Sequence, residues 1–181
     1  MSLKFKFFFL IIAFAVITGC NSSEGEVNIY TGNEVSYELI PGDFQGNETS
    51  GILKIKERTD GKGEIEIMLN GVINGAVHPA HLHFGDLNAN GLVATHLNPV
   101  EETDGVGKSN TLIEQLVNGD DLDYNALLLF DGSVKIHFEA TGDLKDVILG
   151  ATNIGINGSA NEAFLLGIHS ITTCNSDFGN N

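Results

Sequence analysis

The sequence predicts an all-β fold of the sandwich or Greek-key type, and three observations lead to this prediction. Short runs of alternating apolar and polar residues recur along the chain, the clearest at residues 64–69. Turn-forming combinations of Gly, Asn and Asp separate these runs. Glycine is abundant, with 22 residues, whereas proline is scarce, with 3. Runs bounded in this way are typical of half-buried antiparallel strands, and a series of them favours a sandwich.

The turn signals set the expected order of the strands. In the first half of the chain they occur at residues 31–33, 41–43, 46–47, 60–63, 70–71 and 74–75. Strands are expected at residues 52–55, 65–69, 80–84, 126–130, 134–138 and 164–171. The pair Asp131-Gly132 is a hairpin signal. Residues 110–117 are the one helical candidate.

The start of the chain has the pattern of an export signal. Lys4 and Lys6 precede an unbroken apolar run at residues 7–16, which is short for a membrane-spanning helix. The next four residues, Ile-Thr-Gly-Cys, end at Cys20 and resemble the lipobox of bacterial lipoproteins. That resemblance implies cleavage before Cys20 and a lipid on its sulfur. The alternative is an ordinary signal peptide with an incidental cysteine.

These features define the expected organisation of the chain. We expect a lipoprotein signal peptide at residues 1–19, a lipidated N-terminus and tether at 20–33, one folded domain at 34–173 and a C-terminal tail at 174–181. The expected location is the bacterial cell envelope, on the outer membrane or the periplasmic face. Several acyl chains at Cys20 would hold the protein on a membrane far more firmly than one chain.

The charge of the chain limits its partners. The formal net charge is −15, and removal of residues 1–19 with their two lysines makes it −17. Such a surface is not expected to bind nucleic acid, because that binding depends on neutralising phosphates with basic side chains. It would also slow the approach of anionic substrates, although acidic charge can serve solubility alone. The sequence indicates no particular oligomeric state.

The chain has two cysteines, Cys20 and Cys174. If Cys20 carries a lipid, Cys174 has no partner within the chain for a disulfide, although an exported protein could form one. Cys174 lies near the C-terminus among polar residues. We therefore interpret Cys174 as an idle thiol rather than a metal ligand.

The histidines form a pattern that predicts a metal site. The chain has six of them: His78, His81, His83, His96, His137 and His169. His81 and His83 are two apart in a predicted strand, so their imidazoles point to the same face and can converge on one ion. The alternative is two ordinary histidines that bind no metal. Three or four imidazoles from separate strands suit Cu(II), Zn(II) or Fe(II), and ligation by histidine alone favours copper or zinc.

The motifs around these histidines resemble those of the copper–zinc superoxide dismutases. Residues 78–86, His-Pro-Ala-His-Leu-His-Phe-Gly-Asp, are similar to the family's signature HGFHVHxxGD. His-Leu-Asn-Pro at 96–99 is similar to its HFNP motif, and 133–139 to the strand with the last copper ligand. Residues 163–171 are similar to its closing strand. The resemblance spans roughly residues 35–171, in the family's order, and implies a Greek-key sandwich or flattened barrel of about eight antiparallel strands.

The resemblance also implies roles for individual residues. His81, His83 and His137 would be copper ligands. His96 would be the fourth ligand, the one that bridges copper and zinc in the family. It could also be catalytic, because an imidazole released when copper is reduced can take up a proton and supply it to the second half-reaction. Neither remaining histidine matches a copper ligand, and His78 is expected to serve packing or hydrogen bonding.

The sequence also departs from the family pattern. Between His96 and His137 there are carboxylates but no histidine, so the family's zinc site is not expected. The disulfide positions, near Asn90 and Leu166, hold no cysteine. The position of the arginine that attracts superoxide is occupied by Ala163. The missing arginine argues against fast dismutation even with copper bound, because electrostatic steering raises association rates by about 10- to 1000-fold.

Three functions therefore remain in view. The first is a copper-dependent superoxide dismutase of the cell envelope, which converts superoxide to oxygen and hydrogen peroxide. The second is a non-catalytic copper-binding or copper-buffering lipoprotein on the same fold. The third is an interaction module of the chordin-repeat type, which matches only the His81–His83 pair. Copper is the expected cofactor in the first two.

Overall fold

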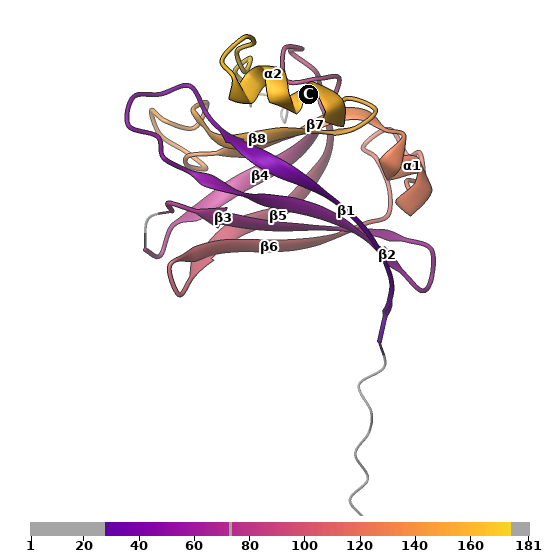
Figure 1. Ribbon diagram of the computed structural model, residues 1–181. Helices are drawn as coiled ribbons and strands as arrows, with labels where there is room; N and C mark the ends of the chain where they lie inside the picture. Colours follow the sequence, from indigo (N-terminus) through magenta and orange to yellow (C-terminus); the bar gives the residue numbers. More distant parts are fainter. Residues whose placement is uncertain (1–27, 73, 175–181) are drawn as a thin grey trace, which may run out of the picture.

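The computed structural model describes residues 28–72 and 74–174, and these residues form an all-β fold. Eight antiparallel strands close into a barrel in the order β1-β2-β3-β6-β5-β4-β7-β8 within this described part (Figure 1). The strands are β1 (Tyr30–Pro41), β2 (Ser50–Arg58), β3 (Gly63–Asn70), β4 (Val77–Phe84), β5 (Val93–Thr103), β6 (Val106–Ile113), β7 (Asp131–His137) and β8 (Ile148–Gly155). The all-β prediction is confirmed.

Alternation along the strands fills the inside of the barrel. Ile65, Ile67 and Leu69 on β3 are almost completely buried, and Ile65 and Ile67 pair with Ile55 and Leu53 on β2. Successive side chains of a strand point to opposite faces, so these residues share the inner face. Burial of each such side chain contributes about 1.5–3 kcal/mol. The strands expected at residues 52–55 and 65–69 are confirmed.

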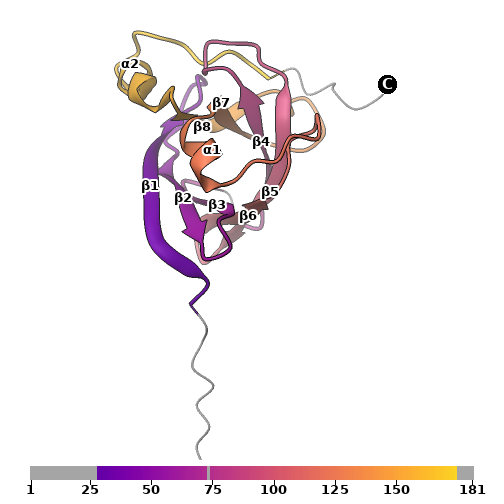
Figure 2. The same cartoon turned by 90° about the vertical axis from the view of Figure 1, so that its right-hand side faces the viewer.

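A second apolar cluster lies outside the barrel. The helix α2 (Asn161–Leu165) and the segment that follows it cross one end of the barrel beside β7 and β8 (Figures 1 and 2). This cluster consists of Ile40, Leu87, Ile148, Ala151, Phe164 and Cys174. As a result β7 is buried on its outer face as well, and Ser133, Lys135 and His137 are at most 1% exposed. This covered outer face is where the histidines meet.

Two local predictions in the middle of the chain are wrong. The expected helix at 110–117 does not form: residues 110–113 are instead the end of β6, where Thr111 and Ile113 are buried and the intervening Leu112 is exposed, as in a strand. The apolar run at 126–130 is not a strand but mostly the helix α1 (Tyr124–Leu128). Asp123 begins this helix by accepting a hydrogen bond from the Ala126 amide at 2.8 Å. Such capping stabilises a helix, although the apolar composition of this run does not by itself predict one.

The predicted last strand at 164–171 is also wrong. After β8 the chain forms a short 3₁₀ helix, η1 (Gly158–Ala160), and then α2. Asn161 fixes this turn: its side-chain oxygen accepts a hydrogen bond from the Asn153 amide at 2.9 Å, and its amide group donates to the Thr152 hydroxyl at 2.9 Å. The similarity of 163–171 to a closing strand therefore does not correspond to a strand here.

The expected hairpin at Asp131-Gly132 is wrong as well, because both residues belong to β7. Gly132 serves a different purpose. A Cβ at this position would collide with the Phe130 ring and lie 2.7 Å from the carbonyl oxygen of His83 on β4. Glycine thus allows β4 and β7 to approach each other beside the histidines.

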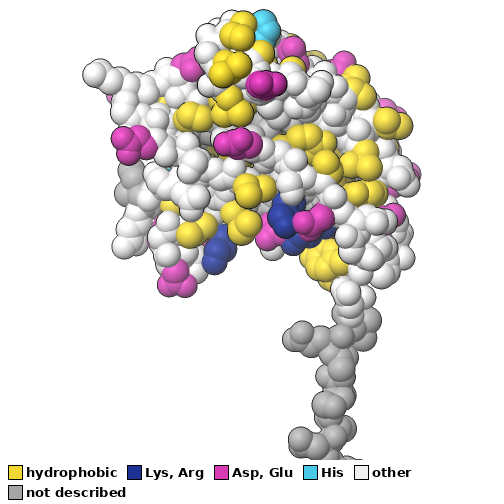
Figure 3. All heavy atoms as spheres, in the orientation of Figure 1, with side chains coloured by type: hydrophobic (Ala, Val, Ile, Leu, Met, Phe, Trp, Pro, Cys, Tyr) yellow, Lys and Arg dark blue, Asp and Glu magenta, His cyan; other side chains and the backbone are white. Residues whose placement is uncertain are grey.

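The described residues also bear on the ends of the chain. The expected signal peptide at residues 1–19 and Cys20 lie outside them, and β1 begins at Tyr30, before the expected domain start at 34. Among the described helices, none has the length and apolar character needed to cross a membrane. On the face of Figure 1, acidic side chains are spread among apolar and neutral ones, and the basic side chains do not form a continuous stripe (Figure 3).

Candidate metal centre

Three neighbouring strands bring four histidines together. β4 lies between β5 and β7, and His81 on β4 is opposite His96 on β5 and Lys135 on β7. The ring of His81 is 4.9 Å from that of His96, 5.0 Å from His137 and 5.9 Å from His83, measured between centroids. The other three predicted site histidines therefore surround His81.

Backbone carbonyls fix the orientation of two of the rings. The Nδ1 atom of His83 is 3.0 Å from the carbonyl oxygen of Gly91, and Nδ1 of His137 is 2.8 Å from that of Lys145. A carbonyl oxygen only accepts hydrogen bonds, so each Nδ1 carries the proton and each Nε2 presents a lone pair. Metal-binding histidines are commonly oriented in this way.

Two ring nitrogens of the site are buried without a partner. Nδ1 of His81 and Nε2 of His137 have no hydrogen-bond partner among the described residues, although both atoms are inaccessible to solvent. A buried polar atom without a partner costs about 1–3 kcal/mol. Coordination to a metal ion would satisfy both atoms, so the donor set fits a metal.

Cys174 completes the group, contrary to our interpretation of an idle thiol in a tail. Its side chain is 4% exposed, and its sulfur is 3.4 Å from Nε2 of His83. One donor atom from each of His81, His83, His137 and Cys174 lies within 4.8 Å of the others. Metal–nitrogen and metal–sulfur bonds are about 2.0 and 2.3 Å, so a nitrogen and a sulfur on opposite sides of one ion lie about 4.3 Å apart, close to the separations in this group. These four residues could hold a metal ion.

His96 lies beside this group rather than in it. Its ring is edge-on to that of His81 and its side chain is exposed. Both residues line a cavity of about 270 Å³, together with Pro79, His137, Glu139, Ala140 and Lys145. A separate cavity of about 260 Å³ reaches Cys174 and is lined by Asn90, Asp146, Thr172 and Thr173. The site is thus bordered by two cavities with different linings.

Burial keeps the histidines of the site neutral. It lowers the pKa of His81 from 6.5 to about 3, with the neighbouring histidines adding to the effect, and it lowers that of His83 to about 4. Burial also lowers the pKa of His137 and raises that of the Cys174 thiol. Neutral imidazole is the form that binds metal, so protons compete weakly for these nitrogens near neutral pH.

These shifts predict that acid weakens the metal-free fold. In the unfolded chain His81 and His83 titrate near 6.5, whereas in the fold they titrate near 3 and 4. Between these values the unfolded chain binds more protons, so the free energy of unfolding falls as the pH is lowered through this window. Urea unfolding of the metal-free protein at about pH 7 and about pH 5 measures the change.

The matched control for this prediction is the double variant His81→Gln/His83→Gln. It retains the carboxylates that also titrate in acid and should lose less stability between the two pH values than the wild type. An equal loss in both proteins would contradict the prediction.

The remaining histidines serve other purposes. Nδ1 of His78 is 2.7 Å from the carbonyl oxygen of Phe138, which is the hydrogen-bonding role expected for it. His169 is exposed and lies against the ring of Phe164, 5.4 Å away between centroids. Ala163, at the position of the family's arginine, lies in α2.

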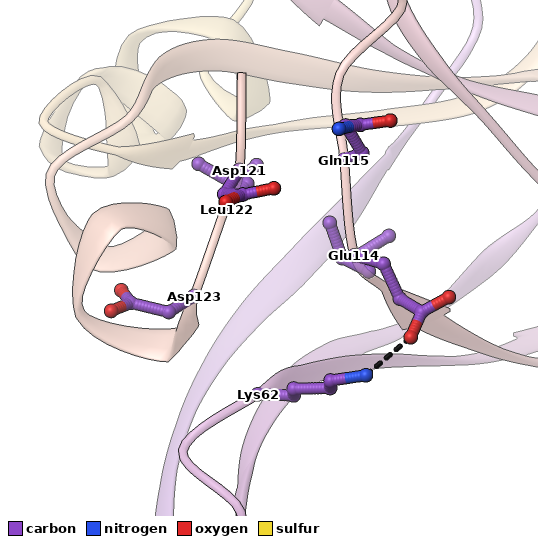
Figure 4. Close-up of a pocket in the computed structure, with 7 residues that line it drawn as sticks. Lys62, Glu114, Gln115, Asp121, Leu122 and Asp123 are labelled. Atoms are coloured by element: carbon purple, nitrogen blue, oxygen red, sulfur yellow. Dashed lines mark hydrogen bonds and ion pairs between the residues drawn. The ribbon is translucent and has the colours of Figure 1, made fainter. Parts of the chain in front are cut away.

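A larger cavity elsewhere contains none of the predicted site residues. It has a volume of about 480 Å³ and lies where the ends of β3 and β6 meet the segment before α1 (Figure 4). Its polar groups are the Lys62–Glu114 ion pair, Gln115, Asp121 and Asp123. Asp123 already caps α1. The cavity therefore offers no imidazole or thiol for metal chemistry.

Comparison with known proteins adds no relative to these observations: no protein-family model matches the chain, and no curated protein does. The resemblance to superoxide dismutases therefore depends on the motif residues of the sequence alone.

Proposed function

We propose that the protein binds copper through His81, His83 and His137 and disproportionates superoxide. The observation that carries the proposal is the convergence of two buried nitrogens without partners, Nδ1 of His81 and Nε2 of His137, beside the oriented ring of His83. The proposal includes a Greek-key arrangement of the barrel, and the pairing of β3 with β6 rather than with the next strand in the chain, β4, supports it.

Copper is the metal that the donors favour. Imidazole ligands suit Cu(II), Zn(II) and Fe(II), and a thiolate suits Cu(I) as well as zinc, so copper would find suitable donors in both of these oxidation states. When bound, copper would accept an electron from one superoxide and return an electron to the next, which leaves as hydrogen peroxide with two protons. The protein residues have to hold the ion, admit the anion and manage the protons.

The cavity beside His96 is the proposed entrance for superoxide. The exposed ring of His96 can take a proton from water and present it to a molecule in the cavity. Lys145 also lines this cavity, but its ammonium group is 2.9 Å from the carboxylate of Asp146, and Glu139 lines the same space. The local charge is therefore mixed, and electrostatic steering of an anion should be weak.

Metal analysis and a superoxide assay test the proposal together. The purified full chain is expected to bind one copper ion in preference to zinc and then to accelerate superoxide decay. His96→Ala should retain copper but lose activity by roughly 100-fold or more, the usual range for a lost proton-transfer group. His169→Ala is the matched control, because this histidine is exposed and outside the site, and it should behave as the wild type. Copper binding without accelerated decay would exclude the dismutase function.

A second candidate function is copper holding without turnover. The buried thiol of Cys174 beside His83 favours it, because a thiolate binds reduced copper firmly. The same assays separate the two functions, since a copper-holding protein would be loaded but inactive.

We further propose that this activity lies in the bacterial cell envelope, on a protein anchored through lipid on Cys20. The support is the basic, apolar and lipobox-like pattern of residues 1–20. The test is incorporation of labelled fatty acid into the wild type and into Cys20→Ser. If Cys20→Ser still incorporates the label, the lipid is not attached to Cys20 and the proposed anchor is disproved.

A further inference from the structure

The segment before Cys174 is tied to the barrel by buried contacts. Lys135 on β7 is 1% exposed, and its ammonium group donates a hydrogen bond to the carbonyl oxygen of Thr172 at 2.7 Å. The Thr172 amide donates to the carbonyl of Leu87 at 2.9 Å, and its hydroxyl donates to that of Asn88 at 2.7 Å. Three contacts to β7 and to the loop after β4 therefore fix the position of Cys174.

The thiol faces the histidines rather than solvent. Nδ1 of His83 donates to a carbonyl, so Nε2 of His83 accepts the hydrogen bond from the Cys174 sulfur, 3.4 Å away. Independently of the cysteine, the unpartnered Nε2 of His137, a residue 1% exposed, lies in the same group of donor atoms. Cys174 and His137 thus place a buried sulfur and a buried ring nitrogen without a partner in one group of possible metal donors.

We propose that Cys174 is a thiolate ligand of the ion held by His81, His83 and His137, and that it makes the site retain Cu(I). This inference rests on the proposed copper site but adds a ligand that the motif resemblance does not contain. As the sulfur–copper bond forms, the S–H bond breaks and its proton passes to solvent, so no electron is transferred in this step. A thiolate selects Cu(I) over Cu(II).

The two cavities leave room for both roles. Cys174 and His96 line separate cavities, so the thiolate would not occupy the side proposed for superoxide. Stabilising Cu(I) would nevertheless oppose the half-reaction in which copper returns an electron to superoxide. The expected consequence is firm retention of reduced copper and slow turnover.

Competition for Cu(I) tests the ligand directly. The full chain is loaded with Cu(I) and titrated with bathocuproine disulfonate, a Cu(I) chelator. Cys174→Ser should lose Cu(I) affinity by more than about 100-fold, the upper limit for a residue that only orients a ligand, and should lose less affinity for Cu(II). Cys20→Ser is the matched control and should retain wild-type affinity.

A second measurement covers the case in which Cys174→Ser folds poorly. In the Cys20→Ser background, bound Cu(I) should protect the remaining thiol from alkylation, and addition of His137→Ala should remove this protection. The Cu(II) form should show sulfur-to-copper charge-transfer absorption. Equal Cu(I) affinity in Cys174→Ser, or no protection of the thiol by copper, would overturn the inference while leaving the histidine site intact. A wild-type chain that binds no copper would refute the proposed function itself.

Discussion

Replacement of His137 by alanine is expected to reduce copper affinity by at least about 1000-fold, because a residue that binds the ion directly matters more than one that only orients a ligand, whose loss costs about 10- to 100-fold. His137 is the only proposed ligand on β7, and its Nε2 is buried without another partner. Alanine leaves only two of the three proposed histidine ligands, His81 and His83, both on β4. Copper per protein after dialysis, followed by competition with a chelator of known affinity, measures the loss.

The control for this experiment is His169→Ala, which removes an imidazole outside the site. It should bind copper with the affinity of the wild type. Circular dichroism and urea unfolding of the metal-free His137→Ala protein show whether the fold persists. Unchanged copper affinity in a folded His137→Ala protein would show that His137 on β7 is not a copper ligand.

Replacement of Leu82 by alanine should have the opposite pattern, with a large loss of stability and little change in copper stoichiometry. Leu82 lies between His81 and His83 in sequence but points into the barrel, where it is fully buried in the apolar core. A buried Leu→Ala change costs about 2–5 kcal/mol through lost contacts and the cavity it leaves. For a domain of this size, that corresponds to a Tm lowered by about 4–20 °C.

Urea unfolding and copper analysis of the same preparation test this pattern. Ile52→Ala is the matched control, because Ile52 is on the outer face of β2 with a side chain 41% exposed, and it should cost far less. If Leu82→Ala lost copper as completely as His137→Ala does, the two faces of β4 would not be independent.

Much of the barrel could be predicted because it depends on local alternation. In β3 the inner residues Ile65, Ile67 and Leu69 follow a period of two, which tells a strand from a helix in a short window. Local sequence patterns did not predict the secondary structure where tertiary packing determined it. Residues 110–113 remain in β6 because they pair with β3, and 124–128 form a helix capped by Asp123.

The site was predictable to the extent that its residues lie in local motifs. His81 and His83 share a face of one strand, a relation visible in the sequence. His96 and His137 were found through the motifs around them. Cys174 has no motif, and 91 residues separate it from His83. No local signal could have identified it.

The sequence by itself therefore determined an all-β chain with a histidine pair on one strand face, since both depend on spacing within a strand. The tertiary structure alone decided that the C-terminal segment turns into α2 instead of a ninth strand in the described part of the chain. It also decided that this segment brings Cys174 to His83. The physical reason is that burial of the outer face of β7 depends on contacts such as Lys135 with Thr172, which join residues distant in the sequence.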